Sequence, residues 1–263
     1  MHKVAYLGGV ARRIPRLRDV IAERDYLRRQ NTEICLENER LRSTPPSQGD
    51  GLKYLFVVTY GRSGSTLLQG ILNTIPGYLI RGENRGLMGD LYKFHQRAVK
   101  DREQRRKAEP IPVTHPWFGI DGYPDDVALS GMRELALSTF IRPESGSRVV
   151  GYKEIRWPQN DLPDFIEYLR SVFPGARFVV NTRSLEEVSR SKWWVDKPNA
   201  LAELKATEER YLALVDSLGE AAFRVHYDDY VADPSSLSSL FEWLGEEFDE
   251  ETVRRTMVRR HSY

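Results

Sequence analysis

The stretch "YLFVVTYGRSGSTLLQGIL", residues 54–72, passes from an apolar run through Gly and small hydroxyl residues into a second apolar run. The first run is typical of a buried parallel strand, and the second is typical of a helix. A Gly-rich turn between the two gathers backbone N–H groups at the positive end of the helix, where phosphate or sulfate binds. Taken by itself, "GRSGST" is explained equally well by an ordinary strand-to-helix turn.

The loop departs from the pattern of nucleotide-hydrolysing enzymes. Their loop reads GxxxxGK[ST], whereas Ser65 follows Gly64 here. The later strand ends, "GYKEIRW" and "NTRSLEE", are basic where such enzymes carry an Asp for Mg²⁺. We therefore expect an anion site without a catalytic metal. The residues expected to form it are Gly61, Arg62, Ser63, Gly64, Ser65 and Thr66.

From Leu52 onward, strand patterns alternate with helix patterns. Strands are predicted at 52–60, 148–155, 177–182 and 222–227, and helices at 65–74, 162–173, from 184, and at 235–244. Ser184, with Glu187 three residues later, has the pattern of a capping box at a helix start. The alternation predicts an α/β fold, a three-layer P-loop-type domain with a central parallel sheet, over residues 52–263.

Residues 86–147 do not follow this alternation. They contain a basic stretch, "LYKFHQRAVKDREQRRK", and an aromatic one, "IPVTHPWFGIDGYPDD". An insertion of this size is often a lid or a substrate wall, which makes Trp117, Phe118 and Tyr123 candidates for an acceptor pocket. The alternative is a helical elaboration with solvated charges, and this is the interpretation we favour for the basic run 97–107.

Residues 1–42 are predicted to be an N-terminal helical segment, and 43–51, "STPPSQGDG", a linker. Within 12–42, one set of apolar residues recurs every seven positions: Val20, Leu27, Ile34 and Leu41. A second set, three positions earlier, is mostly polar: Leu17, Arg24, Asn31 and Asn38. The two series are typical of a short coiled coil and favour a parallel homodimer. A single amphipathic helix lying on its own domain is the alternative.

Charge and hydropathy argue against several classes of partner. The chain has 39 Lys and Arg against 38 Asp and Glu, so it has no general attraction for nucleic acid or anionic membranes. No apolar run reaches the ~18 residues of a membrane span, and the N-terminus lacks the apolar region of a signal peptide. The single cysteine, Cys35, cannot form an intrachain disulfide. We therefore expect a cytoplasmic protein in a reducing compartment.

A second anion site is predicted after the strand "RFVVNT". Arg183 follows that strand directly, and Ser191 comes eight residues later on the helix that Ser184 begins. An Arg at a strand end and a Ser on the next helix can converge on one phosphate. By itself, Arg183 would be explained as well by a surface ion pair. The two sites together indicate a ligand with two separated anionic groups.

These motifs resemble those of a known family. "TYGRSGSTLL" is similar to the 5′-phosphosulfate loop of sulfotransferases that use 3′-phosphoadenosine 5′-phosphosulfate (PAPS), and "VVNTRSLEEVSRS" is similar to their 3′-phosphate motif. "VHYDDYVADPSSLSSLFEWLG" resembles the segment that follows these motifs. The resemblance covers about 52–245 and is closer to the carbohydrate and tyrosylprotein branch, with its bacterial relatives, than to cytosolic phenol and steroid enzymes. The "RKGxxGDW"-type segment of those cytosolic enzymes is missing.

The resemblance implies transfer of a sulfuryl group to an acceptor hydroxyl on a carbohydrate, lipid or other small molecule, with no metal required. It implies Glu83, in "RGENRG", as general base and Lys153, in "GYKEIRW", with Arg62 as catalytic cations. An ion pair of Glu83 with a neighbouring Arg, and a plain surface charge at Lys153, are the structural alternatives. Four histidines are rival bases: His95, His115, His226 and His261. Two alternative functions are a non-catalytic nucleotide-binding coiled-coil protein and a P-loop phosphotransferase.

Overall fold

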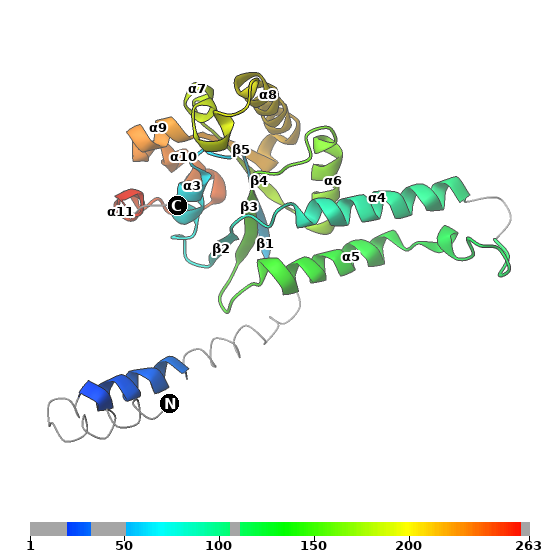
Figure 1. Ribbon diagram of the computed structural model, residues 1–263, viewed down its shortest axis with the longest axis horizontal. Helices are drawn as coiled ribbons and strands as arrows, with labels where there is room; N and C mark the ends of the chain where they lie inside the picture. Colours follow the sequence, from blue (N-terminus) through cyan, green and yellow to red (C-terminus); the bar gives the residue numbers. More distant parts are fainter. Residues whose placement is uncertain (1–19, 33–50, 106–110, 259–263) are drawn as a thin grey trace, which may run out of the picture. The chain divides into compact units, whose positions relative to one another are not determined.

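A computed structural model describes residues 20–32, 51–105 and 111–258 of the chain (Figure 1). Contacts within the chain divide it into two units, Met1–Gln48 and Gly49–Tyr263. In the first unit, residues 20–32 form a helix, and the predicted heptad residues Val20 and Leu27 are exposed on it. The remaining apolar heptad positions and the linker up to residue 50 lie outside the described residues, so the homodimer stays a prediction.

The described part of the second unit is built on a five-stranded parallel sheet in the order β2-β3-β1-β4-β5. The strands are β1 (Lys53–Val58), β2 (Tyr78–Arg81), β3 (Val149–Glu154), β4 (Arg177–Thr182) and β5 (Ala222–His226). Four of them confirm the strands expected from sequence, and the short edge strand β2 was not predicted. Because all five run in one direction, their carboxyl ends meet at a single edge of the sheet.

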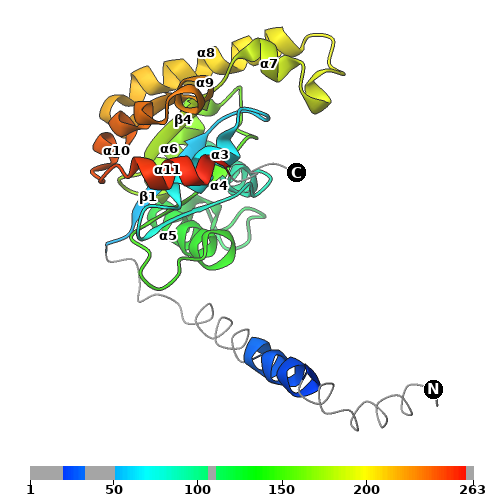
Figure 2. The ribbon, with the colours of Figure 1, turned by 90° about the vertical axis from the view of Figure 1, so that its left-hand side faces the viewer.

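Helices cover both faces of the sheet, which confirms the three-layer fold. Side chains of β1 alternate between two hydrophobic clusters: Phe56 and Val58 belong to one, and Leu55 and Val57 to the other. The first cluster includes residues of α5 (Asp125–Ala136), α6 (Leu162–Val172) and α8 (Ala200–Leu218). The second includes residues of α3 (Ser65–Leu72), α9 (Tyr227–Ala232), α10 (Ser238–Leu244) and α11 (Glu250–Val258). Figure 2 shows α11 lying beside α3, which it contacts.

Three of these helices, α8, α9 and α11, were not predicted. The sequence of α8, "ALAELKATEERYLALVDSL", turns only four side chains fully inward. They are Ala200, Leu204, Tyr211 and Leu214, whose spacings of four, seven and three residues follow one helical face. The charged residues between them made the apolar stripe hard to recognise. In α11 only Val253 and Thr256 are buried, three residues apart.

The insertion 86–147 is helical in its described part. It contains α4 (Leu87–Arg105), the short 3₁₀ turn η1 (Ile120–Gly122), α5, and a π-helical turn, η2 (Leu137–Ile141). Helices α4 and α5 lie side by side and project from one side of the sheet (Figure 1). An ion pair of 2.6 Å between Arg102 and Asp125 joins the two helices. Several charges of the basic run therefore serve the packing of this hairpin, while others are exposed.

Candidate functional site

The loop between β1 and α3 adopts a backbone that favours glycine. Arg62 and Gly64 have φ values of 72° and 77°, both in the left-handed region. A Cβ atom at Gly64 would lie 2.0 Å from Cδ2 of Tyr227, so a side chain there would collide with an aromatic ring. Gly64 is the N-cap of α3, and its carbonyl accepts the first helical hydrogen bond from the Leu67 N–H. The loop therefore delivers its N–H groups to the start of a two-turn helix, as an anion site requires.

A cavity of about 250 Å³ opens beside this loop at the carboxyl edge of the sheet. Most of the residues predicted from sequence line it: Gly61, Arg62, Gly64, Ser65, Thr66, Glu83, Lys153 and Arg183. Five further lining residues were not predicted as site residues: Leu67, Ile155, Trp193, Tyr227 and Met257. The fold thus brings together parts of the chain that are far apart in sequence. The walls are cationic and aromatic, with one carboxylate.

Lys153 and Glu83 form an ion pair at the wall of this cavity. The Nζ of Lys153 donates a hydrogen bond of 2.6 Å to Oε1 of Glu83. The Lys153 side chain is only 5% exposed, whereas that of Glu83 is 37% exposed. Glu83 is the one ion-pair partner of Lys153 within the described residues. Since a buried ammonium has three donors and a strong need for hydrogen bonds, Lys153 is well suited to bind an anion in the cavity as well.

Two predicted site residues, Ser63 and Ser191, do not line the cavity. Ser63 is fully buried, and its hydroxyl lies 2.6 Å from that of Thr59, so this side chain serves the core and not the expected anion. The helix expected to carry Ser191 is shorter than predicted, because α7 (Leu185–Ser189) ends before it. Ser191 instead accepts a hydrogen bond of 3.1 Å from Nε of Arg62. Ser191, eight residues after Arg183, therefore lies beside Arg62 of the Gly-rich loop.

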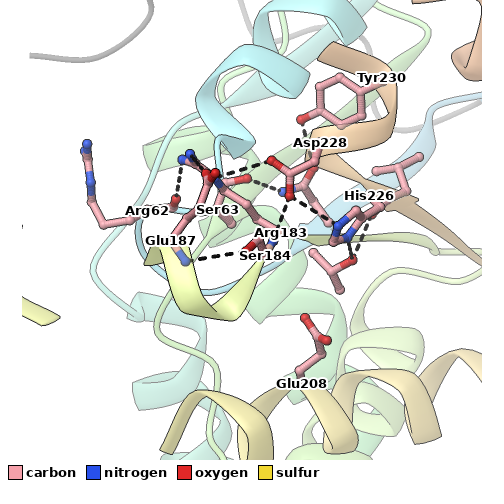
Figure 3. Close-up of polar contacts among 12 residues, drawn as sticks. Arg62, Ser63, Arg183, Ser184, Glu187, Glu208, His226, Asp228 and Tyr230 are labelled. Carbon is pink, nitrogen blue, oxygen red and sulfur yellow. Dashed lines mark hydrogen bonds and ion pairs between the residues drawn. The ribbon is translucent and has the colours of Figure 1, made fainter. Parts of the chain in front are cut away.

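Arg183 lies between the anion loop and two carboxylates (Figure 3). One guanidinium nitrogen donates to the carbonyl oxygen of Arg62 at 3.3 Å, and another pairs with Glu187 at 2.5 Å. Nε is 3.8 Å from a carboxylate oxygen of Asp228, and Cζ is 4.6 Å from the ring centroid of Tyr227. The Ser184 cap expected from sequence is present, with its hydroxyl accepting from the Glu187 N–H. These contacts hold Arg183 at the cavity wall.

Tyr60 is a further residue that holds Arg183, and no motif in the sequence points to it. Its hydroxyl accepts a hydrogen bond of 2.9 Å from the backbone N–H of Arg183 and donates one of 2.6 Å to Glu208 on α8. Burial and the neighbouring Glu208 carboxylate raise the pKa of Tyr60, so its hydroxyl stays protonated. The backbone of the second predicted site is thus fixed by a contact between residues 148 positions apart.

None of the three described histidines named as rival bases lines the cavity. His226 is held by Thr182 at Nδ1 (2.9 Å) and by Asp228 at Nε2 (3.2 Å), a network visible in Figure 3. His95 contacts Tyr123 on the helical hairpin, where burial lowers its pKa. His115 accepts a hydrogen bond from the backbone N–H of residue 117. His261 lies outside the described residues. Among the described residues, Glu83 is therefore the one carboxylate or imidazole that lines this cavity.

The aromatic residues proposed as acceptor walls lie on the helical hairpin and not at the cavity. Trp117 packs under Arg105, with the guanidinium 3.7 Å from its ring centroid. Arg105 ends α4, whose 19 residues begin at Leu87, so the helix carries Trp117 roughly 27 Å from its start. Phe118 follows directly, and Tyr123 contacts His95 in the middle of the hairpin. None of these three rings lines the cavity beside the Gly-rich loop.

The structure is a three-layer α/β fold with a cavity beside a Gly-rich loop that lacks the lysine of nucleotide-hydrolysing enzymes. Residues 55–250 match the protein-family model described as "Sulfotransferase family", and the chain belongs to this family. No curated protein sequence gives a significant match. The sulfotransferase domain of the olefin synthase from Synechococcus PCC 7002 is similar in fold, with 19% identity, 83% of this chain and 82% of that chain covered, and a TM-score of 0.51. Sulfotransferase STF9 from Mycobacterium avium is 17% identical over 79% of this chain and 67% of that chain, with a TM-score of 0.42.

The family match also gives the class of chemistry, which is that of a sulfotransferase. Among the described residues, no helix is both long enough and apolar enough to cross a bilayer. They also contain no cluster of three or more His, Cys, Asp or Glu side chains that could hold a metal ion.

Proposed function

We propose that this sulfotransferase moves a sulfuryl group from PAPS to an acceptor hydroxyl by in-line displacement, with Glu83 as general base. The observation that carries the proposal is the ion pair between Glu83 and Lys153 in the wall of the cavity that the anion loop also lines. A base and a buried cation that share a cavity with converging N–H groups have the parts that sulfuryl transfer needs. We propose a hydroxyl on a carbohydrate, a lipid or another small molecule as acceptor.

In this proposal the loop holds the 5′-phosphosulfate. The N–H groups at the start of α3 and the hydroxyls of Ser65 and Thr66 supply donors at the cavity. Arg62 adds a guanidinium that is steadied from one side by Ser191. Arg183, at the same cavity, is proposed to bind the 3′-phosphate, because a guanidinium suits the paired oxygens of a phosphate. The 5′ end of one nucleotide would then lie at Arg62, and its 3′-phosphate at Arg183.

The transfer itself is a balanced exchange at sulfur. The acceptor O–H bond breaks, its proton passes to the Glu83 carboxylate, and the acceptor oxygen forms a bond to sulfur. On the opposite side, the bond between sulfur and the bridging oxygen breaks, and the electron pair stays on the departing 5′-phosphate. A positioned base contributes ~10²–10⁴-fold to such a step. Lys153 and Arg62 stabilise the negative charge that develops on the leaving side.

The nucleotide is tested by titration calorimetry with adenosine 3′,5′-bisphosphate without Mg²⁺, compared with ATP·Mg. We expect the bisphosphate to bind and ATP·Mg to bind more weakly or not at all. Binding of ATP·Mg alone would favour a P-loop phosphotransferase. If the bisphosphate binds but labelled sulfate is never transferred from PAPS to acceptors or a host extract, the non-catalytic alternative would stand.

The base is tested by Glu83→Gln with labelled PAPS. The rate of transfer should fall ~10²–10⁴-fold, while affinity for the bisphosphate changes little. Glu144→Gln is a matched control, because Glu144 is also an exposed carboxylate in an ion pair. Its partner, Arg81, lies two residues before Glu83 in the chain. This control should keep full activity. Intact transfer by Glu83→Gln would remove the base assignment and leave the family unchanged.

A further inference from the structure

Glu154 is a buried carboxylate beside the site, and the mechanism above does not use it. It ends β3, directly after Lys153, and is only 3% exposed. Burying a carboxylate is costly unless hydrogen bonds replace its water. Glu154 accepts four backbone N–H groups: Oε1 from Ile155 and Arg156 at 2.8 and 3.1 Å, and Oε2 from Asn84 and Gly86 at 3.1 and 3.0 Å. All of its hydrogen bonds to backbone N–H groups therefore go to two loops at the carboxyl edge of the sheet.

These two loops carry groups that line the cavity. Residues 82–86 leave β2, cross the end of β3 and enter α4. Glu83 stands immediately before Asn84, whose N–H is held by Glu154. Arg85 and Gly86 have φ values of 60° and 83°, so this turn uses the left-handed backbone twice in succession. A turn of this kind keeps its shape only when surrounding contacts fix it. On the other oxygen, Glu154 holds the N–H of Ile155, a cavity-lining residue.

We propose that Glu154 is a positioning residue that sets the place of Glu83, an inference that rests on the proposed role of Glu83 as base. The two last residues of β3 act on the same segment in different ways. Lys153 contacts the carboxylate of Glu83, and Glu154 holds the backbone that follows it. Glu154 does not line the cavity, and its four N–H contacts leave it no acceptor role toward a substrate. It therefore acts through Glu83.

Glu154→Gln is the informative substitution. The amide offers one oxygen where the carboxylate offered two, and its NH₂ group would face N–H donors of the backbone. One of the two loops, residues 82–86 or residues 155–156, then loses its hydrogen bonds to Glu154. Because a displacement of about 1 Å can cost ~10²-fold in rate, we expect kcat to fall roughly 10- to 100-fold. The KM for PAPS and the affinity for adenosine 3′,5′-bisphosphate should change less than about twofold, since the contacts of Arg183 do not involve Glu154.

Two controls separate positioning from general damage. Glu154→Asp keeps both oxygens and should restore part of the lost kcat. Glu144→Gln removes an exposed carboxylate that pairs with Arg81 at the end of β2, the strand from which residues 82–86 leave. It should leave kcat and KM unchanged. A fall in nucleotide affinity that matches the fall in kcat would mean that Glu154 merely supports the whole site, and would overturn the proposal.

A double-mutant cycle gives the decisive test. If Glu154 acts only through Glu83, the variant Glu83→Gln/Glu154→Gln should be no slower than Glu83→Gln. Losses that multiply would refute the proposal.

A readout that needs no catalysis separates this inference from the proposed function. Amide hydrogen exchange at residues 84–86 should be at least about tenfold faster in Glu154→Gln than in the wild type, whether or not any acceptor is sulfated. Unchanged exchange at these amides would overturn the positioning role. Absence of transfer by the wild type, with faster exchange in the variant, would overturn the proposed function and leave the hold on the loop established.

Discussion

Replacing Gly64 by alanine tests the geometry of the anion loop directly. Gly64 has φ 77°, and an added Cβ would lie 2.0 and 2.1 Å from two ring carbons of Tyr227. Gly245, which directly follows α10, has nearly the same φ of 78°. No described atom lies within 4 Å of the place that an added Cβ would take there. The two alanine variants therefore share the backbone strain and differ in the collision. Gly245→Ala is the matched control.

The magnitudes follow from this difference. An L-residue in the left-handed region costs ~1–2 kcal/mol, and this applies to both variants. At Gly64 the ring of Tyr227 must also move, which adds an overpacking penalty of ~1–3 kcal/mol. Each kcal/mol lowers Tm by roughly 2–4 °C in a domain of this size. Moving Tyr227 also removes its contact with the Arg183 guanidinium, now 4.6 Å from the ring centroid, so nucleotide affinity should fall as well.

The assay is urea unfolding of both variants with and without adenosine 3′,5′-bisphosphate, supported by titration calorimetry. Gly64→Ala should unfold at lower urea than Gly245→Ala and should gain less stability from the nucleotide. Gly245→Ala should be destabilised but should bind the nucleotide as the wild type does. Equal midpoints and equal affinities for the two variants would show that the contact between Gly64 and Tyr227 does not constrain the loop.

Four further variants test the groups around this site and one distant ion pair. Arg183→Ala should weaken binding of the bisphosphate by roughly 10- to 150-fold, the equivalent of ~1.5–3 kcal/mol for hydrogen bonds to a charged group, measured by calorimetry. Glu187→Gln frees Arg183 from an exposed pair worth ~0.2–1 kcal/mol and should tighten the same binding up to about fivefold. Tyr60→Phe leaves the Glu208 carboxylate and the Arg183 N–H, both part-buried, without this partner and should lower the free energy of unfolding by ~1–3 kcal/mol in urea. Glu246→Gln should cost about 1 kcal/mol at pH 7, and the deficit should shrink as pH falls below 4.5, because hydrogen bonds from Arg148 hold the pKa of Glu246 below that usual value.

Each of these has an outcome that would contradict it. Unchanged affinity in Arg183→Ala would remove the second anion site, and weaker binding in Glu187→Gln would mean that Glu187 supports the arginine and does not compete for it. Tyr60→Phe with wild-type stability would show that water replaces the lost hydroxyl. A deficit in Glu246→Gln that does not shrink at all as pH falls below 4.5 would have to come from packing, since a carboxyl with a lowered pKa loses its stabilising effect as the pH falls below its unfolded value.

The parts of this fold that could be predicted are those whose cause is local in sequence. Strand β1, the Gly-rich loop and α3 follow one another within 20 residues, and their apolar runs and turn residues are visible directly. The capping of α7 by Ser184 is equally local. The short edge strand β2 could not be recognised, because four residues carry too little periodicity.

The site itself was predictable only in part. Charged residues at strand ends were recognised as candidates, since parallel strands bring their carboxyl ends together. The contacts that fix those residues were not. Tyr60 and Glu208 meet across 148 positions of sequence, and Glu154 bonds to backbone N–H groups, which leave no trace in residue identity. Nothing in the sequence therefore singles out Glu154, although the structure buries it together with Lys153.

The pairing of charges at the cavity bears on how the proposed ligand would bind. In the structure, Lys153 pairs with Glu83, and Arg183 pairs with Glu187. A phosphate at Arg183 would compete with the Glu187 carboxylate, whose side chain is 58% exposed, and weakening this pair costs little because it is solvated. An anion at Lys153 need not displace Glu83, because the ammonium has further donors to offer. The proposed base can therefore keep its place while the proposed donor binds, whereas a phosphate at Arg183 would compete with Glu187 for the same guanidinium. This asymmetry is why binding should respond to Glu187→Gln and turnover to Glu83→Gln.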